Sequence, residues 1–251
     1  MNYSPTLAVA TAGFEILAAL WAFSLIWSRR DGKRQLGCPE RRIAATTGLI
    51  LLLLAGYQMT EVAICANVGS SGFMPRLAFI IVTWLPALGL LLVAQVQRPI
   101  NRSFYGFSVG MLAASAGIVA WICLDPSFAS ASVCNAVYAR YAHAMPRFQL
   151  YGAYYWAGLL GMALLSGLGV RTAQTPIRRR LHGHVLLGTL GFVLPSIALS
   201  YAVPATRGAL PSILCHFALI LALLLTHMLW ELRAVPVEAT ELTNSSPGAR
   251  I

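Results

Sequence analysis

Two acidic side chains lie within long apolar stretches of this chain, where a charge is costly. Glu15 belongs to the stretch 7–27 and Glu61 to the stretch 43–64. An ionised carboxylate near the middle of a bilayer costs about 2.5–3.5 kcal/mol. Each of the two therefore needs a partner, a proton or a water-filled cavity, which makes both of them candidates for a ligand, ion or proton site.

Glu61 shares one helical face with other polar side chains. Tyr57, Gln58 and Cys65 lie three or four residues away from it, the spacing that puts side chains on the same side of a helix. Contact with lipid would leave the Glu61 charge unpaired. We therefore predict that this face points into a helix bundle.

A second polar pair occurs in the last apolar stretch, where Ser212 and His216 are one turn apart. Glu61 and His216 could together coordinate a metal ion, relay a proton or hold a cationic ligand. The alternative is an interhelical hydrogen-bond lock, from Glu61 to His216 or from Gln58 to a hydroxyl. Such bonds average about 0.6 kcal/mol in membranes and require no function. The predicted outward-facing polar pocket comprises Glu15, Gln58, Glu61, Trp84, Tyr201, Ser212 and His216.

Three cysteines fall at or beyond the predicted outer ends of helices, where a disulfide can persist if that side faces an oxidising compartment. They are Cys65, Cys123 and Cys134. We favour a bond between Cys65 and Cys134, which would tie the long loop 125–149 over the pocket as a lid. The alternative is that all three are reduced, because connectivity cannot be read from sequence.

The elements that position these residues are predicted to be membrane-spanning helices. Of the 251 residues, 58% are hydrophobic and 10% are charged, and the mean hydropathy is +0.70. Soluble domains carry about 25% charged residues, so a soluble enzyme, a disordered chain and a disulfide-rich secreted module are excluded. We predict an all-α, seven-transmembrane-helix bundle as a single domain over 1–235, followed by a disordered cytoplasmic tail over 236–251. The predicted spans are 7–27, 43–64, 77–96, 104–124, 150–170, 185–203 and 210–232.

The loops between these stretches differ in positive charge. The first, third and fifth loops hold twelve Lys and Arg residues, against four in the second, fourth and sixth. Positive residues accumulate on the cytoplasmic side of membrane proteins. This predicts an N-terminus outside and a C-terminus in the cytoplasm, and it explains the net charge of +10 without nucleic acid as a partner.

Several cofactors and reactions are poorly supported. His184 and His227 could face each other around a haem, but the simpler interpretation of 178–184 is a solvated basic loop near anionic headgroups. Retinal is disfavoured because the single lysine, Lys33, lies in a loop and no helix offers a Schiff-base amine. The chain has no phosphate-binding loop, dinucleotide fingerprint, nucleophile elbow or HExxH motif. This favours a protein that is not an enzyme, without deciding the question.

Three functions stay open at this point. The first is a sensor or carrier that binds a small molecule or ion in the polar pocket. The second is an accessory or structural subunit of a larger membrane complex, and the third is a membrane-embedded, metal-dependent enzyme. The expected partners are the lipid bilayer and other membrane subunits, and the expected location is a cell membrane of the bacterial inner-membrane type, crossed several times.

Two short segments resemble a family of bacterial seven-helix integral membrane proteins without an assigned activity. Gly56-Tyr57-Gln58-Met59-Thr60-Glu61, followed by Trp84-Leu85-Pro86, resembles the QxxEG…WP pattern of that family. The segment from Pro211 to Ala218 is similar to its S-x-W-C-x-F-A motif. The chain departs from these patterns at Val62 and Leu214, where the family has Gly and Trp. The resemblance implies a seven-helix fold and adds no chemistry.

Overall fold

Seven long helices and one short β-hairpin make up the computed structural model. It describes residues 5–27, 37–68, 72–97, 102–129, 131–135, 138–142, 147–203, 206 and 209–234. The predicted tail over 236–251 lies outside the described residues. In chain order the elements are α1 (Thr6–Trp27), α2 (Cys38–Cys65), α3 (Phe73–Val96), α4 (Arg102–Leu124), β1 (Ala131–Cys134), β2 (Ala139–Ala142), α5 (Arg147–Thr172), α6 (Pro176–Ala202) and α7 (Leu210–Ala234).

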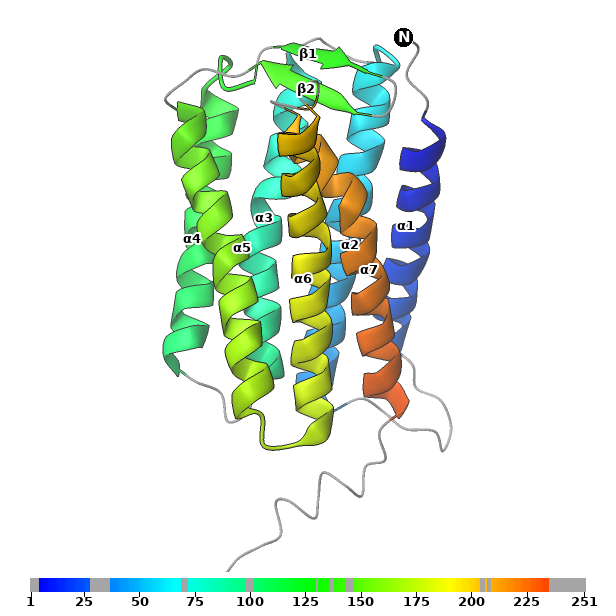
Figure 1. Cartoon of the computed structure of the whole chain (residues 1–251), viewed down its shortest axis with the longest axis vertical. Coiled ribbons are helices and arrows are strands. Elements are labelled where there is room, and N and C mark those ends of the chain that lie inside the picture. Colours follow the sequence, from blue (N-terminus) through cyan, green and yellow to red (C-terminus); the bar gives the residue numbers. More distant parts are fainter. Residues whose placement is uncertain are drawn as a thin grey trace, which may run out of the picture.

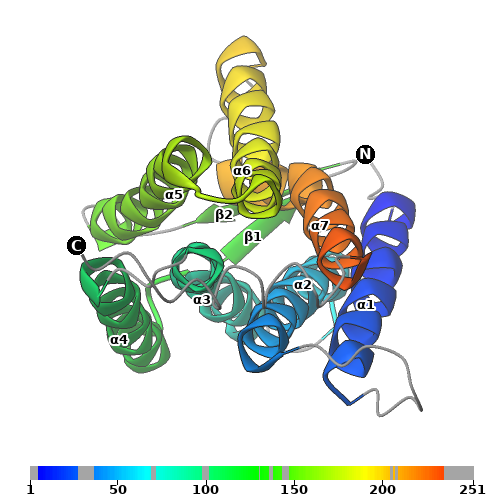
Figure 2. The same ribbon diagram turned by 90° about the horizontal axis from the view of Figure 1, so that it is seen from below.

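The seven helices run roughly side by side in one bundle, and the hairpin covers one end of it (Figure 1). We call this the hairpin end and the other the opposite end. The α1 helix begins at the hairpin end and α7 finishes at the opposite end. Seen end-on, α3 lies between α2, α4 and α5, with α1 and α4 on opposite sides of the bundle (Figure 2).

All seven helices described by the structure are long and apolar enough to cross a membrane. They contain 22 to 28 residues, which at about 1.5 Å per residue exceeds the roughly 30 Å of a bilayer hydrocarbon core. The prediction of a multi-pass, seven-helix bundle is therefore confirmed at the level of helix number, length and composition.

The starts of two helices differ most from the predicted spans. The α2 helix begins at Cys38 rather than 43, and α6 begins at Pro176 rather than 185. Pro39 and Pro176 occupy the first turns, where a missing N–H costs nothing. The interpretation of 178–184 as a solvated loop is wrong, because this segment forms the first turns of α6 and buries His182 to 2% exposure.

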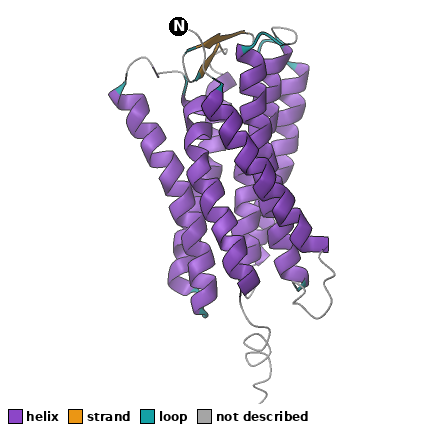
Figure 3. Cartoon of the chain, turned by 90° about the vertical axis from the view of Figure 1, so that its right-hand side faces the viewer, coloured by secondary structure: helices purple, strands orange, loops and turns teal. Residues whose placement is uncertain are grey.

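The hairpin was not predicted from the sequence, which suggested only a long loop. Its two strands are antiparallel, with Ala131 opposite Ala142 and Cys134 opposite Ala139. It lies across the end of the helix bundle (Figure 3). A disulfide joins Cys65 at the end of α2 to Cys134 in β1, with a Cα–Cα distance of 5.6 Å, while Cys123 is free and exposed.

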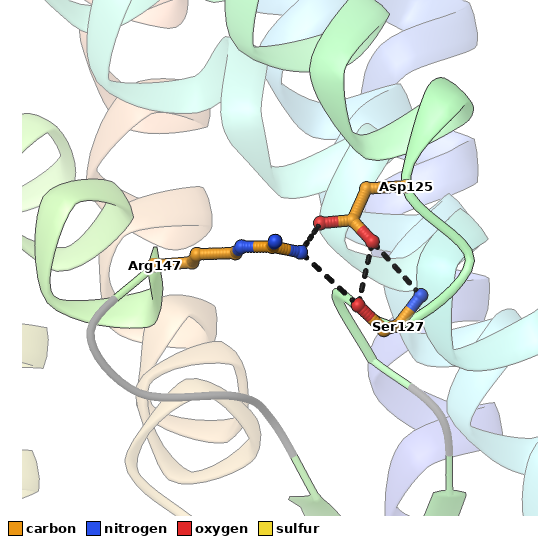
Figure 4. A network of polar contacts seen from close by, with 3 residues as sticks. All are labelled: Asp125, Ser127 and Arg147. Carbon is orange, nitrogen blue, oxygen red and sulfur yellow. Dashed lines mark hydrogen bonds and ion pairs between the residues drawn. The ribbon is translucent and has the colours of Figure 1, made fainter.

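The two ends of the segment that carries the hairpin are joined by a polar network (Figure 4). Arg147, in the first turn of α5, donates to Asp125 at 2.5 Å and to Ser127 at 3.2 Å. Ser127 also donates to Asp125 through its hydroxyl and its backbone N–H. The hydrogen bonds from Ser127 and the charge of Arg147 hold the pKa of Asp125 below its usual range. The carboxylate therefore stays ionised near neutral pH and holds the base of the hairpin segment.

Beneath the hairpin, aromatic side chains form a packed layer. The Phe79 ring makes edge-on contacts, with ring centroids 5.2–5.8 Å apart, to Phe128, Tyr141, Phe148 and Tyr151. Edge-to-face pairs in this range are favourable beyond the apolar area that they bury. This layer joins α3 and α5 to β2, so the hairpin packs on a hydrophobic surface.

The disulfide makes a testable contribution to this arrangement. We expect Cys134→Ser to lower the free energy of unfolding by about 2–4 kcal/mol, because the cross-link restricts a long loop of the unfolded chain. Thermal unfolding of the full chain in mild detergent measures this. The matched control is Cys123→Ser, which removes a free, exposed thiol. Equal unfolding temperatures for the two variants would contradict the prediction.

Candidate functional site

The two intramembrane carboxylates are both enclosed by protein. Glu15 of α1 and Glu61 of α2 each have 0% exposure. Both lie in the neighbourhood of the buried Cys215 of α7. The α1 helix packs against α2 and α7, and α2 also packs against α7. The carboxylates therefore enter the same three-helix region, and Glu61 faces the bundle interior as its position among polar residues predicted.

Glu61 is held by a hydroxyl that also holds the hairpin. Ser212 in the first turn of α7 donates from Oγ to Glu61 Oε2 at 2.7 Å. The same Oγ accepts a hydrogen bond from the Ala139 N–H of β2 at 3.2 Å. One serine thus links α2, α7 and the hairpin, and all three residues are buried.

Two further contacts on the same face of α2 reinforce this junction. The Tyr57 hydroxyl lies 3.1 Å from the Tyr141 hydroxyl of β2. Gln58 donates from Nε2 to the Cys215 carbonyl of α7 at 2.9 Å. With the disulfide at Cys65, every polar position of this helical face contacts α7 or the hairpin.

His216 is not the ion-pair partner of Glu61 that we expected. Among the described residues no ion pair joins the two within 4 Å, although they interact electrostatically over a longer distance. The half-buried His216 places Nδ1 2.8 Å from the Ser212 carbonyl of its own helix. Neither interhelical bond predicted as an alternative is found in the described residues: Glu61 accepts from the Ser212 hydroxyl, and Gln58 donates to a backbone carbonyl.

Two residues of the predicted pocket lie elsewhere. Tyr201 is 79% exposed on the outer surface of α6. Ser196 lies on the inward face of this helix. Tyr201 follows five residues later, and at about 100° per residue its side chain points about 140° away from that of Ser196. Trp84 is half-buried and packs against the apolar core of the bundle.

The polar cluster is closed rather than open to the outside. Glu61, Gln58 and Ser212 all have 0% exposure, and β2 covers them. The described part of the long loop forms a hairpin that covers these side chains, and the space beneath it is filled by the side chains themselves.

Several buried oxygens in this region lack a hydrogen-bond donor. Within the described residues they are both carboxylate oxygens of Glu15, Oε1 of Glu61 and Oε1 of Gln58. The Tyr57 hydroxyl and the Ala139 N–H lie beside the Glu61 carboxylate, but Oε1 is outside hydrogen-bonding geometry with either. Unsatisfied buried acceptors are expensive, and a cation or a donor-bearing ligand would satisfy them.

A small apolar cavity lies next to the cluster. Its volume is about 20 Å³, room for roughly one water molecule. Leu54, one turn before Gln58, and Cys215 are among its lining residues, with most of the others apolar side chains of α2, α3, α5, α6 and α7. Neither Glu15 nor Glu61 lines this cavity, which does not itself form a polar pocket.

Sequence reasoning identified Glu15, Gln58, Glu61 and Ser212, but it missed the residues that the hairpin contributes. Ala139 participates through its backbone, which carries no side-chain signal. Tyr141 belongs to a four-residue strand, too short for alternation of polar and apolar residues to stand out.

Comparison of the chain with protein-family models finds no match, and comparison with the curated proteins finds none either.

The central role of Ser212 leads to a prediction about stability. We expect Ser212→Ala to lower the free energy of unfolding by about 1–2 kcal/mol, because it removes partners from both Glu61 Oε2 and the Ala139 N–H. The control is Ser196→Ala, a buried serine whose hydroxyl bonds only the Phe192 carbonyl of its own helix. Reversible unfolding in mixed detergent micelles measures both variants. Equal losses would mean that the junction adds nothing beyond local helix contacts.

Proposed function

We propose that this chain is a multi-pass membrane protein that binds a small cation, or a small molecule with a cationic group, in an occluded site between α1, α2 and α7. The observation that supports this proposal is the pair of fully buried carboxylates, whose oxygens are mostly without donors in the described residues. Acceptors in excess of donors favour a ligand that carries positive charge or several N–H groups.

The closed hairpin suggests how such a site would operate. A ligand could reach Glu61 from the hairpin end only if β2 separated from Ser212. The disulfide would keep the hairpin attached to α2 while it moved. This behaviour suits a sensor or carrier that holds its ligand away from solvent.

We further propose that the hairpin end faces the cell exterior and the opposite end the cytoplasm. The loops on the opposite side carry most of the positive charge. A disulfide at the hairpin end fits an oxidising compartment, and Cys38 at the opposite end is free. These features suit a cell membrane such as the bacterial inner membrane.

Reporter fusions test this orientation. A reporter inserted at Lys33 should signal cytoplasm, and one inserted at Arg207 should signal the exterior, because the two positions follow odd and even numbers of spans. A paired reporter set, one active only in the cytoplasm and one active only outside it, serves as its own control. The reverse pattern would overturn the proposed orientation.

Cation binding is tested by thermal unfolding of the full chain in nanodiscs. The probes are Na⁺, K⁺, Ca²⁺ and methylammonium, each compared with N-methylglucamine chloride at equal ionic strength. We expect one probe to raise the unfolding temperature, since a ligand at 100 times its Kd stabilises by about 2.7 kcal/mol. We expect Glu61→Gln and Glu15→Gln each to abolish that shift.

The control variant is Glu40→Gln, which removes the same charge from the first turn of α2, far along the helix from Glu61. It should keep the shift. If no probe stabilises the wild type, or if the Glu15 and Glu61 variants respond like the control, the proposal fails. A stoichiometric partner chain that copurifies in mild detergent would instead favour an accessory subunit of a membrane complex.

A further inference from the structure

We propose that His184, His227 and Glu231 form a binding site for a divalent transition-metal ion of the zinc class, at the opposite end of the bundle. One ligand atom from each residue can be chosen so that all three lie within 4.8 Å of one another. Glu231 Oε1 is 3.6 Å from His227 Nε2, and Glu231 Oε2 is 3.9 Å from His184 Nδ1. This site is separate from Glu15 and Glu61 and does not depend on the function proposed for them.

The donor set suits zinc better than other common ions. Two imidazoles and one carboxylate are a known zinc ligand set that leaves a fourth position for water. Ligands at about 2.1 Å in tetrahedral geometry are roughly 3.4 Å apart, close to the 3.6 Å between Glu231 Oε1 and His227 Nε2. Each of the three residues offers a ligand atom within 4.8 Å of the other two. Calcium and magnesium prefer all-oxygen sites. Three donors around one point also differ from the two opposed ligands of a haem.

The surroundings orient the histidines and leave a carboxylate oxygen free. His184 Nδ1 lies 2.8 Å from the Arg180 carbonyl one turn earlier in α6. When Nδ1 carries the proton, this bond holds the ring and leaves the Nε2 lone pair for an ion, as backbone carbonyls do behind many metal-bound histidines. Oε2 of Glu231 is buried without a hydrogen-bond partner in the described residues. His227 stacks on Trp230 with ring centroids 5.7 Å apart.

Close packing of α6 on α7 brings the three side chains together. A Cβ at Gly188, one turn after His184, would lie 2.7 Å from Leu221 Cδ1 and 3.3 Å from Leu221 Cα. At Gly191 a Cβ would lie 2.8 Å from Ile220 Cγ2. The glycines thus let the α7 backbone approach α6, and the His184 and His227 rings are 5.0 Å apart between centroids. His227 is half-exposed, which leaves an entry path for the ion.

Metal titration of the untagged full chain in nanodiscs tests the proposal. We expect Zn²⁺ to bind at one equivalent per chain by calorimetry, and Co²⁺ to give the absorption bands of a low-coordinate nitrogen and oxygen site. His227→Ala and Glu231→Gln should each weaken Zn²⁺ binding at least tenfold. His216→Ala, which removes a histidine at the hairpin end, should bind Zn²⁺ like the wild type.

Thermal unfolding provides a second measurement, and its wild-type arm does not require any variant to fold. Zn²⁺ should raise the unfolding temperature of the wild type and of His216→Ala, and leave that of Glu231→Gln unchanged. Absence of saturable Zn²⁺ binding to the wild type would overturn the proposal, and the cluster would then be an ion-paired contact between α6 and α7. Zn²⁺ binding that survives in both site variants would also overturn it, because the ion would lie elsewhere.

Discussion

A carboxylate enclosed by apolar helices needs a hydrogen-bond donor, a proton or a cation. Glu61 has this need at the hairpin end of the bundle, and the structure there is arranged around it. The donor is Ser212, which sits in the first turn of α7 and also accepts the Ala139 N–H. Loss of the hydroxyl would leave two buried polar groups unpaired at once. One side chain therefore contributes both to the position of α7 relative to α2 and to the attachment of the hairpin.

The hairpin is joined to the helices by contacts of three different kinds. The disulfide ties β1 to α2, the Ser212 bond ties β2 to α7, and the Phe79 aromatic layer supports the hairpin from α3 and α5. At its base, Arg147 and Asp125 connect the two ends of the same segment. A two-stranded hairpin is marginally stable alone, so its shape here depends on the bundle beneath it, and the polar cluster in turn depends on the hairpin for its closure.

The bundle concentrates its polar chemistry at its two ends and in different helix pairs. At the hairpin end, α2 and α7 meet through Gln58, Glu61 and Ser212. At the opposite end, α6 and α7 meet through His184, His227 and Glu231. The α7 helix contributes to both clusters, and it also supplies residues to the apolar core of the bundle and to the small cavity within it. The two clusters differ in donor chemistry, since one is dominated by carboxylate and amide oxygens and the other contains two imidazoles.

The sequence alone predicted the seven spans and the inward face of α2, because hydropathy and helical spacing are local properties of the chain. It favoured a bond between Cys65 and Cys134 without deciding it, and the tertiary structure made that pairing. It placed Glu61 correctly and its partner wrongly: Ser212 and His216 are one turn apart on the same face of α7, so the choice between them depends on the position of α7 along its axis relative to α2, which helix packing decides. Tyr201 was misplaced because the rotation of α6, which its neighbouring helices set, turns this side chain outward. The hairpin and the basic first turns of α6 also required the tertiary structure, because a four-residue strand and a charged helix end are stabilised by what they pack against and carry little signal of their own.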